Sequence, residues 1–118
     1  MKKNIVKDKS FEFALIIVNC YKFLTSEKKE YVLSKQLLRS GTSIGANIRE
    51  SEHGQSKADF IHKLSISLKE ANETEYWIEL LHKSDYLDDK QFEQLSVVVI
   101  ELIKLLTSII KTSKQNNK

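Results

Sequence analysis

Apolar residues recur every three or four positions along most of the chain, which is the spacing of one buried helix face. The clearest stripe consists of Phe92, Leu95, Val99, Leu102, Leu106 and Ile109, at intervals of three, four, three, four and three residues. Earlier stripes of the same kind begin near Phe13, Leu33 and Phe60. The pattern predicts four helices, near residues 9 to 25, 29 to 53, 56 to 84 and 88 to 112.

Polar residues and one glycine mark the ends of these helices. Ser56 is followed three residues later by Asp59, a variant of the capping box, and predicts the start of the third helix. Asp88 and Asp89 favour the start of the fourth. We expect Gly54 to end the second helix in the left-handed conformation that glycine adopts without steric cost.

The composition agrees with an all-helical chain. There is no proline and there are three glycines, where average usage would give about six and about eight. Joins of two to eight residues between the predicted helices force neighbours to be antiparallel. We therefore predict an all-α, antiparallel up-down-up-down four-helix bundle, a single domain over residues 1 to 118 with frayed ends at about 1 to 8 and 112 to 118.

The third and fourth predicted helices carry more apolar surface than one small bundle needs to bury. Tryptophan and tyrosine lie off the inner stripe of the third helix, and these are residue types that interfaces enrich. A wide core is one interpretation, but we favour a homo-oligomer in which this surface meets another chain. The candidate interface residues are Ile66, Tyr76, Trp77, Leu80, Val98 and Leu105.

Cysteine content and hydropathy indicate where the protein resides. The single Cys20 cannot form an internal disulfide, which fits a reducing cytoplasm. The apolar stretch from Phe13 to Val18 is too short for an export signal. The most apolar segment, residues 95 to 110, contains Glu101 and Lys104, so we expect no membrane span.

Two Glu-x-x-His pairs have the spacing that di-iron bundles use, Glu50 with His53 and Glu79 with His82. In an antiparallel bundle, however, the second pair lies roughly 35 Å from the first, so the two cannot share a metal ion. The chain also lacks a phosphate-binding glycine loop and a recognisable nucleophile constellation. We expect no metal, no cofactor, no catalytic residue and no small-molecule ligand.

The middle of the second helix, residues 40 to 47, has small and polar residues where helix formers are expected. Gly41 and Gly45, one turn apart, would cost about 2 kcal/mol against alanine, and a closely packed neighbouring helix would offset that cost. Polar residues on the same face need partners if they are buried. The favoured interpretation is an internal polar network of Ser40, Asn47, Ser51 and Glu75, and the alternative is a small-molecule contact site.

The opposite face of the second helix is basic. Lys35, Arg39 and Arg49 fall within an arc of about 80° at 100° per residue. Residues 1 to 69 hold thirteen Lys and Arg against seven Asp and Glu, a balance of +6, while residues 70 to 118 hold six against nine, a balance of −3. Such a stripe could track nucleic-acid phosphates, or it could be an ordinary solvated helix face.

One run in the second helix, continued in the third, forms a specific pattern. The run is Leu38-Arg39-Ser40-Gly41-Thr42-Ser43-Ile44-Gly45-Ala46-Asn47-Ile48-Arg49-Glu50, and the continuation consists of Phe60, Leu64, Ser67, Leu68, Glu70 and Ala71. Helix propensity gives no reason for glycines and polar residues to recur at those positions. On this pattern, residues 9 to 110 resemble the four-helix-bundle family of bacterial 23S rRNA intervening-sequence proteins. Where many members look like N-I-A-E-G, this chain has Arg49 and Ser51, with the glycine later at Gly54.

The resemblance implies a ring-shaped homopentamer, since structurally known relatives form such rings. A related branch, the accessory proteins of diversity-generating retroelements, associates with reverse transcriptase and nucleic acid. By that analogy RNA or DNA binding through Lys35, Arg39 and Arg49 is one functional hypothesis. The other is a protein-binding adaptor or scaffold ring with no nucleic-acid role, and the family supplies no catalytic residues.

Overall fold

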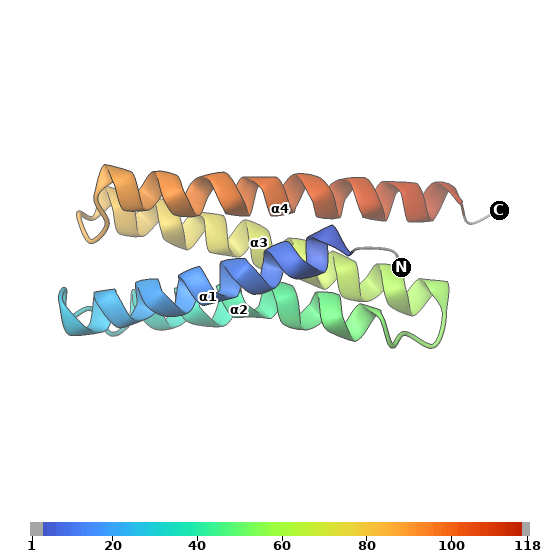
Figure 1. Ribbon diagram of the computed structural model, residues 1–118, viewed down its shortest axis with the longest axis horizontal. Helices are drawn as coiled ribbons and strands as arrows, with labels where there is room; N and C mark the ends of the chain where they lie inside the picture. The colour runs from blue at the N-terminus through green and yellow to red at the C-terminus, as the bar shows by residue number, and fades with distance from the viewer. Residues whose placement is uncertain (1–3, 117–118) are drawn as a thin grey trace.

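The computed structural model describes residues 4–116 as four antiparallel helices. They are α1 (Ile5–Ser26), α2 (Leu33–Ser51), α3 (Lys57–Lys83) and α4 (Asp89–Gln115). Each helix packs against its neighbours in the chain, and α4 returns beside α1 (Figure 1). No strand occurs among residues 4–116. The predicted all-α up-down-up-down bundle is therefore confirmed.

Two helices begin four residues away from the predicted positions, for different reasons. The first begins four residues early, because the Asn4 carboxamide accepts the N–H of Lys7 at 3.0 Å. The second begins four residues late, because Lys29 adopts a left-handed φ of 54°. The predicted bounds of 9 and 29 were wrong. The helices extend over residues 5–8 and 112–115, which we expected to be frayed, whereas residues 1–3 and 117–118 lie outside the described part.

The start of α2 is held by one buried carboxylate. Glu30 is 8% exposed, and its two oxygens accept the backbone N–H groups of Val32, Leu33 and Ser34 at 3.2, 3.0 and 2.7 Å. Burial alone would raise the pKa of Glu30, but these hydrogen bonds outweigh it and hold the pKa below its ordinary value. The loop before α2 is therefore tied down by a charged cap.

The remaining caps confirm two predictions and overturn one. The Ser56 hydroxyl accepts the N–H of Asp59, and Asp88 forms a complete capping box with Gln91. Gly54, in contrast, is not a left-handed cap: no described glycine has a positive φ, and α2 ends at Ser51 with Glu52 as its cap. A side chain at Gly54 would meet the backbone of Phe60 and Ser51 at 3.2 and 3.3 Å, so close approach explains the glycine.

The core lies along the bundle axis and contains the predicted stripes. Every helix contributes fully buried apolar side chains, among them Phe13, Ile17, Leu37, Ile44, Leu64, Ile78, Val99 and Leu102. Gly41 brings α2 close to α1, because an added Cβ would lie 2.8 Å from a side-chain carbon of Ile17. Gly45 similarly faces Ser10, at 3.3 Å. The expected close helix contact at the two glycines is confirmed, and the neighbour is α1.

Candidate nucleic-acid interface

The three basic residues predicted on α2 are all exposed, but they lie on two different flanks of the helix. Arg39 turns toward α3, where it meets two glutamates. Arg49 turns toward α1, where its guanidinium lies 5.0 Å from the centre of the Phe11 ring. Arg39 and Arg49 are separated by about 80° around the α2 axis, and this angle is enough to turn them toward different neighbouring helices. The sequence thus placed them correctly on the outer side of α2 but not relative to α1 and α3.

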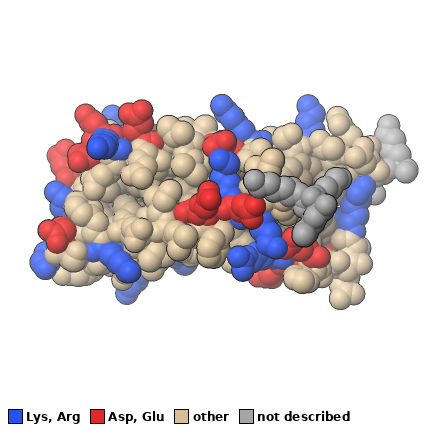
Figure 2. Space-filling view, in the orientation of Figure 1, with Lys and Arg blue, Asp and Glu red and all other residues tan. Residues whose placement is uncertain are grey.

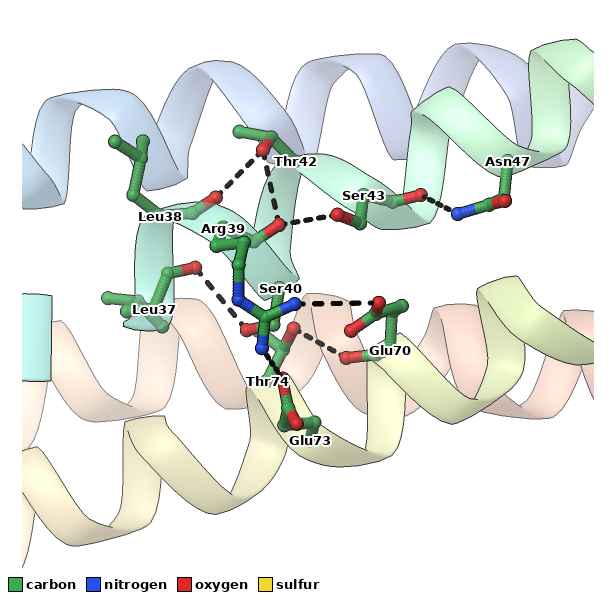
Figure 3. Close-up of polar contacts among 10 residues, drawn as sticks. All are labelled: Leu37, Leu38, Arg39, Ser40, Thr42, Ser43, Asn47, Glu70, Glu73 and Thr74. Atoms are coloured by element: carbon green, nitrogen blue, oxygen red, sulfur yellow. Dashed lines mark hydrogen bonds and ion pairs between the residues drawn. The ribbon is translucent and has the colours of Figure 1, made fainter. Parts of the chain in front are cut away.

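Arg39 is paired across the α2–α3 seam. Its Nη2 donates to Glu73 Oε2 at 2.6 Å, and its Nη1 lies 3.8 Å from Glu70 Oε2 (Figure 3). Lys63 of α3 pairs in the same way with Glu50 of α2, at 2.9 Å. On this flank both Arg39 and Lys63 therefore have a carboxylate partner within the chain. Sequence reasoning missed these partners because Glu70 and Glu73 are more than thirty residues away from Arg39.

Lys35 and Arg49 belong to a different surface, which we call the α1–α2 basic face. It consists of Lys22, Lys28, Lys29, Lys35 and Arg49, all exposed. None of the five forms an ion pair with another residue of the described range 4–116. Arg49 and Lys28 instead lie over aromatic rings, Phe11 and Phe23, at 5.0 and 6.0 Å from the ring centres.

Helix geometry explains why these cations share one side of the molecule. Phe11 and Lys22 are eleven residues apart in α1, about three full turns, so Lys22 lies on the flank where Phe11 meets Arg49. Lys28 and Lys29 occupy the α1–α2 loop, and Lys35 follows in the first turn of α2. Residues 18–49 hold six Lys and Arg against two Glu, a balance of +4. That local count is the sequence signal which could have identified this face.

Charge is divided between the two turns at one end of the bundle. In Figure 2, basic side chains gather mostly at the lower left, over the α1–α2 turn, and acidic ones at the upper left, over the α3–α4 turn. The acidic turn contains Asp85, Asp88 and Asp89. Of these, Asp89 pairs with His82 of α3 at 2.8 Å. The basic face is thus one pole of a separated charge distribution.

The polar residues in the middle of α2 do not form the expected network with Glu75. Ser40 and Asn47 donate to the Leu37 and Ser43 carbonyls of their own helix (Figure 3). Ser51 likewise donates to the Ile48 carbonyl. Glu75 forms no hydrogen bond with them in the described structure. The reason is that hydroxyl and amide groups on a helix reach the preceding turn more easily than a neighbouring helix. A buried interhelical hydrogen bond runs instead from the Ser67 hydroxyl of α3 to the Ile44 carbonyl, at 2.8 Å.

The predicted interface residues differ in how much surface they offer. Tyr76 is 59% exposed, whereas Ile66, Trp77, Leu80, Val98 and Leu105 are half-buried. Trp77, Val98 and Leu105 pack against the core, so part of the surplus apolar surface belongs to a wide core. Other apolar side chains, not singled out from the sequence, are more exposed: Ile5, Phe11, Leu15, Tyr31, Val32, Val97 and Ile100. For the five that lie on helices, the signal was the outward phase of their helices, which the inner stripes obscured, whereas Tyr31 and Val32 lie in the α1–α2 loop.

Metal-binding and nucleophilic groups are not brought together. Glu50 pairs with Lys63, and His82 stacks on Phe92 at 4.1 Å, so the two Glu-x-x-His pairs have separate surroundings. Within residues 4–116 no three His, Cys, Asp or Glu side chains cluster as a metal site. Burial raises the pKa of Cys20 to about 11, so its thiol stays protonated at neutral pH. None of the described helices has the length and apolar character to cross a bilayer.

Comparison with known proteins agrees with this architecture. A crystal structure of a protein of unknown function from the S23 ribosomal protein family of Bacteroides thetaiotaomicron superposes with a TM-score of 0.90 at 64% sequence identity. The match covers 91% of this chain and 99% of that one. No curated protein matches the chain.

The fold and its surfaces define a small antiparallel four-helix bundle with a closely packed α1–α2 seam and a basic pole. The model of the family described as 23S rRNA-intervening sequence protein matches residues 2–108. The chain belongs to this family, and the resemblance stated from the α2 run is confirmed.

Proposed function

We propose that the protein is a non-enzymatic homo-oligomer that binds RNA or DNA phosphates through the α1–α2 basic face. The observation that carries the proposal is the contrast between paired and unpaired cations. Lys22, Lys28, Lys29, Lys35 and Arg49 have no carboxylate partner within residues 4–116, so phosphates would meet uncompensated charge. Arg39 is left out of this proposal because Glu70 and Glu73 already balance it.

The oligomeric part of the proposal rests on exposed apolar residues of α3 and α4. Tyr76, Val97 and Ile100 have outward-facing side chains that would be better covered by a second copy. The number five for the ring is taken from the family resemblance. Native mass spectrometry at micromolar concentration tests assembly, and a spectrum with monomer alone would contradict it.

Tyr76→Glu combined with Val97→Glu should release folded monomer, because each would place an unpaired charge in the joint. These two positions are better probes than Trp77 and Leu105. The latter pair packs against the core, so charged substitutions there would also unfold the bundle.

The test of nucleic-acid binding is a salt titration. Phosphate contacts release counterions, so log affinity should fall linearly with log salt, by about 0.7 per contact for single strands. Lys22→Ala combined with Lys35→Ala should reduce that slope by about 1.4. The matched control is Arg39→Ala combined with Lys63→Ala, which removes the same net charge from paired positions and should leave the slope almost unchanged.

A protein-binding adaptor is the second candidate function, and a groove between α1 and α4 favours it. The groove has a volume of about 230 Å³ and an apolar floor that includes Ile16, Phe23 and Leu95. Its rim carries the amides of Asn19, Gln91 and Gln94. At about 50 mM salt, proteins that bind phosphates non-specifically still bind detectably. Absence of binding to structured RNA, single-stranded RNA and duplex DNA under that condition would favour the adaptor function.

A further inference from the structure

An exposed aromatic ring stands at the basic end of the bundle. Tyr31 lies in the loop between α1 and α2 and is 56% exposed, and the adjacent Val32 is 71% exposed. Lys28, Lys29 and Lys35 all lie within four residues of this tyrosine. An aromatic ring among unpaired lysines combines the two features that single-strand binding proteins use, a face for stacking and charge for phosphates.

The loop backbone that carries this ring is held by hydrogen bonds on both sides. The Glu30 carboxylate on one side of Tyr31 accepts three backbone N–H groups from residues 32 to 34. The backbone N–H of Glu30 also donates to the Leu24 carbonyl of α1 at 3.0 Å. Because the backbone of this loop is preorganised, little backbone entropy is lost when a ligand stacks on the ring.

A second tyrosine with almost the same exposure has different surroundings. Tyr76 of α3 is 59% exposed, but its ring makes an edge contact with Trp77 at 5.0 Å between centres. Residues 70 to 82 around it contain four glutamates and no lysine or arginine. Exposure alone does not distinguish the two rings, but the sign of the neighbouring charge does, because only Tyr31 is surrounded by groups that attract phosphates.

The far end of the basic face offers a second planar group. Arg49 lies about 24 Å along α2 from its first residue, Leu33, which follows the Tyr31 loop, at 1.5 Å per residue. Its guanidinium carbon lies 5.0 Å from the centre of the Phe11 ring, and the residue is exposed. Unpaired bases stack on arginine planes as well as on aromatic rings. A track of this length suits a short strand, at the lower end of single-strand site sizes of about 4 to 16 nucleotides.

We infer that the α1–α2 basic face takes single-stranded RNA or DNA, with an unpaired base stacked on Tyr31 and phosphates on Lys28, Lys29 and Lys35. This inference rests on the proposed function and specifies its ligand. Bases in a duplex are stacked and paired with one another, so they cannot offer a face to Tyr31.

The test compares three labelled probes by fluorescence anisotropy at about 50 mM salt. They are oligothymidylate of about 12 nucleotides, an abasic strand of equal length and a duplex of equal length. Oligothymidylate should bind between about fivefold and about a hundredfold more tightly than the abasic strand. Tyr31→Ala should remove that advantage without changing abasic binding, whereas Tyr31→Phe, which keeps the ring, should retain it. Val32→Ala is the matched control: it shortens the adjacent exposed side chain, keeps the Tyr31 ring and should have no effect.

The outcomes separate the inference from the proposed function. Equal affinity for all three probes, unaffected by Tyr31→Ala, would overturn the inference while phosphate binding stands. No binding of any probe would overturn the proposed function. Sedimentation velocity of Tyr31→Ala should match that of the parent, and a changed oligomeric state would assign the ring to assembly and overturn stacking.

Discussion

The two flanks of α2 use their cations in opposite ways. On the α3 side, Arg39 and Lys63 form ion pairs that cross the seam, and Ser67 donates to the Ile44 carbonyl. On the α1 side, glycines bring the backbones close, and Lys7 of α1 pairs with Glu52 at the end of α2 at 2.9 Å. The five cations of the α1–α2 basic face stay unpaired within residues 4–116. The α3 flank therefore uses ion pairs along its seam to join helices, while the α1 flank joins helices mainly by shape, with one ion pair at the end of α2, and leaves the cations of the basic face available.

This difference shows why a basic stripe on one helix is a poor guide to binding. The angular positions of Lys35, Arg39 and Arg49 on α2 are similar, but their availability depends on the helix beside each. A cation beside Glu70 and Glu73 would have to give up those contacts to meet a phosphate. The following predictions disturb one flank at a time.

The largest effect is expected at the glycine contact between α1 and α2. In Gly41→Ala the new Cβ would lie 2.8 to 3.0 Å from three side-chain carbons of the buried Ile17. Overpacking this tight costs about 3 kcal/mol, the upper end of the usual range, against a gain in helix propensity of about 1 kcal/mol. The free energy of unfolding should fall by about 2 kcal/mol, measured by urea denaturation. Gly45→Ala is the matched control, because its Cβ would meet the Ser10 hydroxyl at 3.3 Å. There the smaller packing cost and the gain in helix propensity should nearly cancel.

An equal loss of unfolding free energy in Gly41→Ala and Gly45→Ala would contradict the close approach of α1 at Gly41. It would show instead that helix propensity or the unfolded state dominates at these positions.

The sequence predicted the helices well because their apolar periods are long and their polar caps are local. Ser56 and Asp88 act through residues three positions away, a spacing that the sequence displays directly. Glu30 escaped prediction because its carboxylate reaches forward over a loop whose backbone turns at Lys29, and no local pattern specifies that turn. Arg39 was misjudged because its partners belong to another helix, and their contact depends on the register of α2 against α3.

The second prediction concerns the cap that holds the Tyr31 loop. Glu30→Gln should lower the free energy of unfolding at neutral pH by about 1 kcal/mol, the usual effect of losing a cap. The folded pKa of Glu30 lies below its ordinary value of 4.5, so its stabilising contribution is present above pH 4.5 and is lost as pH falls through the folded pKa. The difference between parent and variant should therefore shrink on acidification.

Denaturation curves at several pH values check this result. Glu27→Gln is the control, because Glu27 is exposed and should show no such difference. A gap between parent and Glu30→Gln that stays constant as the pH falls would rule out a charged cap.

The smallest effect is expected at the seam on the α3 side. Arg39 is 55% exposed, and exposed ion pairs contribute between about 0.2 and about 1 kcal/mol. Arg39→Ala should therefore lower the free energy of unfolding by about 0.5 kcal/mol, and this loss should diminish in high salt because the pair with Glu73 is screened. Lys35→Ala, on a residue with no ion-pair partner in residues 4–116, should have no measurable effect on stability but should reduce the salt dependence of nucleic-acid binding. If Arg39→Ala reduced that salt dependence as much as Lys35→Ala, the cation of the α3 flank would be open to phosphates, and the contrast between the two flanks would fail.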